Sequence, residues 1–83
     1  MLRVFVISPE ASLFEGEASS VVAPAFDGEV GILTGHAPMM TLLGKGQLVV
    51  SGSGEPRRFR IEGGFMQVLN NEVRVVTEHG AAA

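Results

Sequence analysis

The stretch that most directly decides the fold is "FMQVLNNEVRVVT", residues 65–77. Apolar and polar residues alternate on both sides of Asn70-Asn71, which is the pattern of two half-buried β-strands. Asparagine tolerates the positive φ that a tight two-residue hairpin turn needs. The predicted cross-strand pairs are Leu69 with Glu72, Val68 with Val73, Gln67 with Arg74 and Met66 with Val75. One face of this hairpin is apolar and the other mixed, which favours this register.

The same period of two continues through the rest of the chain. In "RFRIE" (58–62), Phe59 and Ile61 share one face, and the charged residues share the other. Further strands are expected at Leu2–Ile7, Glu17–Ala23, Val30–Leu33, Met39–Leu43 and Gln47–Val50. No window of ten or more residues has convincing helical spacing. Many short strands separated by Gly, Pro and Ser predict an antiparallel β-sandwich or a flattened barrel.

Length and composition predict one small globular domain, residues 1–83, with a frayed tail at 79–83. The chain is 46% apolar and 18% charged and has no cysteine, which excludes disulfides and thiolate metal sites. A chain of this size buries only about 60% of its unfolded surface, so its core has no room for a large substrate cavity. We expect a soluble, intracellular protein, because no apolar run approaches the roughly 18 residues that span a bilayer and the N-terminus has the character of a strand.

The charge balance argues against nucleic-acid binding. The net charge is −3, and the one basic cluster, Arg57, Arg58 and Arg60, is diluted by Glu55 and Glu62. Binding to nucleic acid normally requires a basic stripe. The cluster is typical of the solvent-facing side of a strand.

The glycine-rich stretch "DGEVGILTGHAPMMTLLGKG" (27–46) does not match a catalytic, metal or phosphate site. His36 lies near Asp27 and Glu29, but the chain has no G-x-S-x-G motif, no cysteine and no tyrosine. His79, the other histidine, forms no metal-binding spacing with His36, and the surroundings of "GKG" do not match a Walker A loop. No catalytic residue, metal ligand or cofactor site is therefore predicted.

The apolar residues of this stretch favour recognition instead. A small core cannot bury all of them, so we expect alternate members to be buried, such as Ile32, Met40 and Leu42, and the others to form an exposed patch. Contiguous exposed apolar patches mark partner surfaces. The residues alone thus predict a small β interaction module without naming its partner.

"DGEVGILTGHAP" (27–38), followed by "MMTLLGKGQL", resembles the signature of the epsilon subunit of rotary F-type ATP synthases, close to D-G-E-x-G-I-L-P-G-H-A-P. The similarity continues in "VISPEASLFEGEASSVVAP" (6–24) and "FRIEGGFMQVLNNEVRVVTE" (59–78), so it covers nearly the whole chain in one order. The resemblance implies an all-β, flattened antiparallel sandwich of about ten short strands. Thr34 departs from the usual proline.

The resemblance also implies a non-catalytic subunit of the central stalk. Such a subunit docks on the γ subunit and on the c-ring, and so couples proton-driven rotation to ATP synthesis in the catalytic head. Carried over by motif position, Asp27, Gly28 and Glu29 are expected to face the c-ring. The residues expected to face γ are Ser8, His36, Ala37, Pro38, Met39, Met40 and Thr41.

Length marks a second departure from the family. Members usually continue into two C-terminal helices that inhibit ATP hydrolysis and, in some members, bind ATP. Residues 1–83 do not supply them, so we expect neither that inhibition nor ATP binding. The implied location is peripheral, on the cytoplasmic face of a bacterial inner membrane or the stromal side of thylakoids. The alternative is an unrelated β-sandwich that binds a ligand or a protein; the absence of Trp and Tyr disfavours a sugar ligand.

Overall fold

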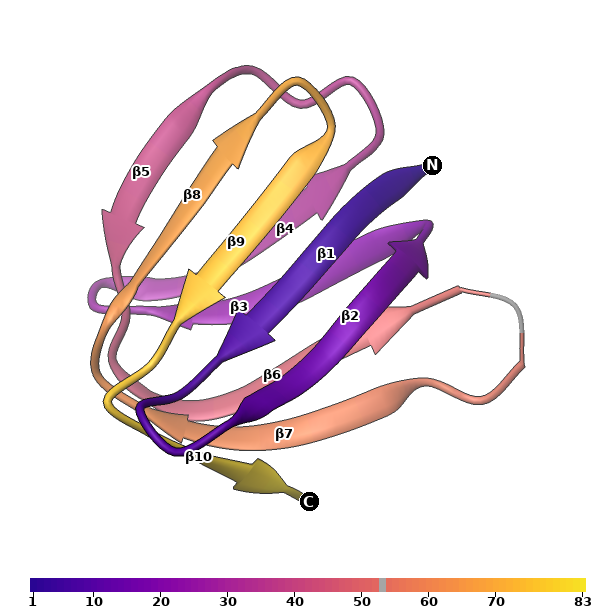
Figure 1. The fold of residues 1–83 in the computed structure, drawn as a ribbon. Coiled ribbons are helices and arrows are strands. Elements are labelled where there is room, and N and C mark those ends of the chain that lie inside the picture. The colour runs from indigo at the N-terminus through magenta and orange to yellow at the C-terminus, as the bar shows by residue number, and fades with distance from the viewer. Residues whose placement is uncertain (53) are drawn as a thin grey trace.

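The computed structural model describes residues 1–52 and 54–83, which form two five-stranded sheets packed face to face (Figure 1). Sheet A has the strand order β2-β1-β9-β8-β5, and sheet B has the order β10-β7-β6-β3-β4. The strands are β1 (Leu2–Ile7), β2 (Ser12–Ala18), β3 (Ser20–Ala25), β4 (Gly28–Leu33), β5 (Met39–Leu42), β6 (Lys45–Ser51), β7 (Arg57–Glu62), β8 (Phe65–Leu69), β9 (Glu72–Val76) and β10 (His79–Ala82). The β-sandwich expectation is confirmed.

The β8–β9 hairpin has the predicted register, from Leu69 opposite Glu72 to Met66 opposite Val75. Its two turn residues, Asn70 and Asn71, have φ values of 51° and 61°. Positive φ at both central residues is the requirement of a type I′ turn, whose twist matches that of the flanking strands. The side-chain alternation and the two turn asparagines therefore determine the register of this hairpin.

The pairing of β1 with β9 differs from the expected antiparallel arrangement. These strands run parallel, with Arg3 opposite Glu72 and Ile7 opposite Val76. Because the partners are far apart in sequence, neither a turn signal nor a local pattern identifies the pairing. It places the N-terminal strand inside sheet A, between β2 and β9.

The predicted strand Glu17–Ala23 is two strands in different sheets. β2 ends at Ala18 and β3 begins at Ser20, so the chain changes sheets at Ser19. The backbone N–H of Ser19 donates to the carbonyl of Ser51, at 2.7 Å, which anchors this corner to β6. No Gly or Pro stands at this break, and the turn-forming residues there are only Ser19 and Ser20, a weaker signal.

The expectation that residues 79–83 form a frayed tail was wrong. Residues His79–Ala82 form β10, which pairs antiparallel with β7 along Phe59–Glu62. Thr77, which is 1% exposed, lies just before this strand. Its hydroxyl is 2.9 Å from the carbonyl oxygen of His79 and 3.1 Å from that of Gly63. This hydroxyl holds the start of β10 beside the β7–β8 turn, which composition alone did not indicate.

The core lies between the sheets and contains alternate residues from both. Its largest fully buried side chains are Phe59, Leu2, Ile32, Leu48, Ile61, Met66, Val4, Val6, Val21, Val68, Val73 and Val75. Ile32 is buried as expected, but the expectation that Met40 and Leu42 are core residues was wrong, since they are 64% and 63% exposed.

The phase of β5 explains the error. Met39 pairs with buried Val68 and packs against the core, so Met40 and Leu42 point outward. Leu43 continues this alternation: it is buried and bridges Ala25 of sheet B, where the chain leaves sheet A.

Candidate functional site

The turn between β3 and β4 carries the residues expected to face the c-ring. Asp27, Gly28 and Glu29 are all exposed, and Gly28 has a φ of 131°, a value that L side chains rarely adopt. The N–H of the preceding residue, Phe26, donates to the carbonyl of Leu42 at 3.0 Å. This hydrogen bond holds the turn against the last residue of β5, and the acidic side chains of the turn project into solvent.

A second tight turn follows β4. The N–H of His36 donates to the carbonyl of Leu33 at 3.0 Å, and Gly35 has a φ of 88°. These are features of a type II turn, in which the third residue needs positive φ and the second favours proline. Thr34 occupies that second position. The His36 ring is half-buried, and its Nδ1 lies 2.7 Å from the carbonyl oxygen of Ala37, to which it donates.

Replacing Thr34 with proline should stabilise the protein by about 0.4–1 kcal/mol, because proline restricts the unfolded chain at a position whose folded geometry suits it. The measurement is the free energy of unfolding in urea. Thr41→Pro is the matched contrast: this position lies inside β5, opposite Met66, where proline removes a donor from a strand and should destabilise. A loss of stability in Thr34→Pro would contradict the type II geometry.

β5 joins the two candidate regions. It begins at Met39, directly after residues 34–38, which we call the His36 loop, and ends at Leu42, whose carbonyl accepts the hydrogen bond from the β3–β4 turn. As an edge strand of sheet A it presents one free side (Figure 1). The residues expected to face γ, from His36 to Thr41, thus form one continuous strip, and those expected to face the c-ring lie at its far end.

An apolar row crosses the outer face of sheet A at the Leu42 end. Leu42 pairs with Phe65, Phe65 with Val76, and Val76 with Ile7. Leu42 is 63% exposed and the other three are half-buried. We call these four residues the apolar row. Together with exposed Met40 it makes an apolar surface that the core does not use.

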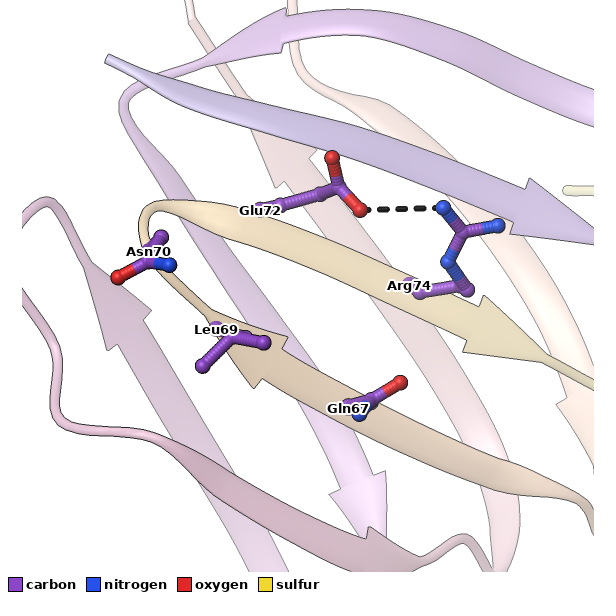
Figure 2. Close-up of a pocket in the computed structure, with 5 residues that line it drawn as sticks. All are labelled: Gln67, Leu69, Asn70, Glu72 and Arg74. Atoms are coloured by element: carbon purple, nitrogen blue, oxygen red, sulfur yellow. Dashed lines mark hydrogen bonds and ion pairs between the residues drawn. The ribbon is translucent and has the colours of Figure 1, made fainter.

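The other end of the same face is polar. Arg3 bonds Glu15 and Arg74 bonds Glu72, both at 3.0 Å, and each pair is about half exposed, so each adds little stability. Both guanidinium groups also lie over the ring of Phe5, at 5.7 and 4.9 Å. Figure 2 shows Glu72 and Arg74 on β9 beside Gln67 and Leu69 of β8.

Ser8 does not join the strip. It lies at the end of β1, beyond Ile7, whereas the His36 loop lies beside the β8–β9 turn at the opposite end of sheet A. Ser8 is 6% exposed, and its hydroxyl is bonded within the turn that contains Ala11. Its local role is to close that turn.

Within the described residues, the side chains considered for a catalytic or metal site do not lie together. His36 and Asp27 lie at opposite ends of β5, and His79 lies on β10 of sheet B. No group of three or more potential ligands gathers among residues 1–52 and 54–83. Three hollows in this part of the chain measure about 200–250 Å³, below the roughly 300 Å³ at which small-molecule sites begin. The same residues include no helix with the length and apolar character needed to cross a membrane.

Comparison with known proteins identifies the family to which the chain belongs. Residues 1–83 match the family described as "ATP synthase, Delta/Epsilon chain, beta-sandwich domain". The chain belongs to this family. It is 44% identical over 80 residues to the ATP synthase epsilon chain of Leptospira borgpetersenii, an alignment that covers 96% of this chain and 63% of the relative. It is 37% identical to the ATP synthase epsilon chain of Caulobacter vibrioides, covering 99% of this chain and 95% of the relative.

Two solved structures contain chains with the same fold. A chain in the cryo-EM structure of the Euglena gracilis mitochondrial ATP synthase, covering OSCP, F1 and the c-ring, has a TM-score of 0.89 at 23% identity, over 98% of this chain and 52% of that one. A chain in the central stalk and c-ring structure of the Tetrahymena thermophila mitochondrial ATP synthase has a TM-score of 0.83 at 16% identity, over 96% and 65%. The domain described here spans 63% of the length of the Leptospira relatives.

Proposed function

We propose that this protein is a non-catalytic central-stalk subunit of a proton-translocating F-type ATP synthase. In this role it docks on the γ subunit and the c-ring and transmits the rotation of the ring to the catalytic head. The observation that carries the proposal is the family match over residues 1–83. The complex is membrane-bound and the subunit is a peripheral part of it, on the cytoplasmic or stromal side.

The distribution of apolar residues supports docking through the outer face of sheet A. Met40 and Leu42 are more than 60% exposed there, and the apolar row extends the surface across to β1. The outer face of sheet B is more polar, with exposed Arg58, Arg60 and Glu62 on β7. Partner surfaces combine an apolar centre with a polar rim, and the charged pairs beyond Met40 would supply part of such a rim.

We assign the γ subunit to the strip from His36 to Leu42 together with the apolar row, and the c-ring to Asp27, Gly28 and Glu29. The β3–β4 turn projects from one end of β5, so one partner can lie along the strand while another meets its tip. Because the acidic turn and the apolar strip differ in chemistry, contact with the ring should weaken with salt more than contact with γ.

The test is binding to a purified γ subunit from the same source, measured by titration and by size-exclusion chromatography. Met40→Glu with Leu42→Glu should lower the affinity at least about tenfold, since it places two charges in a desolvated contact. Met39 is left unchanged because it packs against the core.

The matched control adds the same charge to the other sheet. Gln47→Glu with Ala81→Glu changes two exposed residues that both pair with Arg60 on the outer face of sheet B. This control should bind γ like the wild type, and both double variants should keep wild-type circular dichroism. Equal loss in the two variants, or no wild-type complex at micromolar concentration, would contradict the proposed docking.

A further inference from the structure

Asn71 lies where three segments of the chain meet. Its main-chain carbonyl accepts a hydrogen bond from the N–H of Arg3 on β1, at 2.8 Å. Its side-chain Oδ1 accepts a second from the N–H of Gly35, at 2.7 Å. Gly35 is 36 residues away in sequence. One residue of the β8–β9 turn therefore contacts both the N-terminal strand and the His36 loop, which passes beside that turn in Figure 1.

The His36 loop, residues 34–38, needs such an anchor because it carries the chain from sheet B to sheet A. Apart from the half-buried His36, its residues are exposed. The bond between Leu33 and His36 closes the turn internally but does not orient it against the sandwich. The hydrogen bond from Gly35 to Asn71 orients the loop against the sandwich, because the backbone of Asn71 is itself hydrogen-bonded to β1. A loop that is ordered before docking loses less entropy when a partner binds.

The left-handed backbone of Asn71 contributes to this geometry. Its φ of 61° belongs to the type I′ turn, a conformation that Asn, Asp and Gly tolerate. Asn70, with a φ of 51°, meets the same backbone requirement, but the bond to Gly35 comes from Asn71. The turn alone thus accounts for an asparagine or glycine at both positions, and the bond to Gly35 requires an acceptor only at residue 71.

We propose that Asn71 is a positioning residue that holds the His36 loop in the conformation that docks on the γ subunit. This role rests on the proposed function, because it assigns a purpose to the loop that faces γ. Asn71 acts through Gly35 and the turn, and it has no need to touch the partner itself.

Three variants separate positioning from turn formation. Asn71→Gly keeps the positive φ and removes the acceptor. Asn70→Gly makes the same change at the neighbouring position and keeps the bond to Gly35. Asn71→Asp restores an acceptor oxygen on a residue that tolerates this backbone, so it serves as the conservative rescue.

Two measurements are made on the whole 83-residue chain. The first is amide hydrogen exchange of Gly35 by NMR, without any partner, which should become several-fold faster in Asn71→Gly only. The second is the affinity for γ, which should fall roughly three- to tenfold in Asn71→Gly, the range that loss of one hydrogen bond produces. Asn70→Gly and Asn71→Asp should match the wild type in both.

The outcomes distinguish the two hypotheses. Unchanged Gly35 exchange in Asn71→Gly, or unchanged γ affinity while the wild type binds, overturns the role of Asn71 alone. An equal loss of affinity in Asn70→Gly attributes the effect to the turn and also overturns it. A wild-type protein that binds no γ subunit overturns the proposed function instead, whatever the exchange data show.

Discussion

Phe59→Ala should lower the free energy of unfolding by about 3–5 kcal/mol, the usual cost of truncating a buried aromatic residue. Phe59 is 1% exposed and is the largest fully buried side chain of the core. Its ring meets that of Phe14 edge-on, with centroids 6.1 Å apart, and the guanidinium of Arg57 lies 5.6 Å from its centroid. Removing the ring leaves a cavity between the sheets and takes a partner from both neighbours.

The loss is large relative to the stability of so small a domain. At roughly 0.05–0.15 kcal/mol per residue, a chain of this length has a total stability of about 4–12 kcal/mol. Urea denaturation followed by circular dichroism gives the measurement. Phe26→Ala is the control, because Phe26 is 67% exposed and its truncation should change stability by less than about 0.5 kcal/mol. A loss below about 1 kcal/mol for Phe59→Ala would show that the core is packed differently.

Gly64→Ala should lower the free energy of unfolding by about 2–6 kcal/mol, through strain and crowding at the backbone. Gly64 has a φ of 102°, and a Cβ at this position would overlap the carbonyl oxygen of Val76 and lie 2.7 Å from the Cα of Thr77. Strain in this region of φ costs about 1–3 kcal/mol, and overpacking adds about 1–3 kcal/mol. The close approach arises because the β7–β8 turn crosses the start of the segment that leads to β10.

Gly54→Ala separates the two contributions. Gly54 has a similar φ of 89°, and a Cβ added there would have no atom of the described residues within 4 Å beyond its chain neighbours, so only the strain remains. The difference between the two unfolding free energies, measured in the same urea titration, isolates the overlap. Equal losses in both variants would mean that the backbone around Gly64 relaxes freely, and the crowding at Val76 would then be without consequence.

The two turns of the candidate site were predictable because they are local. Gly28 and Gly35 adopt positive φ, and their neighbours in "DGE" and "TGHAP" carry the turn chemistry within a few residues. The resemblance singled out the same segments from motif order. Whether the residues assigned to γ and the c-ring touch those partners stays a prediction.

The apolar row was not predictable, because its members come from four strands that meet through non-local pairing. Phe65 and Val76 belong to the predicted hairpin, but the alternation within the hairpin does not indicate which other strands pair with it in sheet A. Ile7 joins only because β1 runs parallel to β9. Leu42 was expected in the core because the sequence does not fix the phase of β5, which the pairing of Met39 with buried Val68 sets.

By itself the sequence determined the all-β class, most of the strands and the register of the β8–β9 hairpin, since these depend on side-chain period and on backbone preferences within a few residues. The tertiary structure alone decided the parallel joint of β1 with β9, the pairing of β10, the outward face of β5 and the bond from Asn71 to Gly35. These features join residues far apart in the chain, and they form because burying both sheet faces together outweighs what each segment prefers alone.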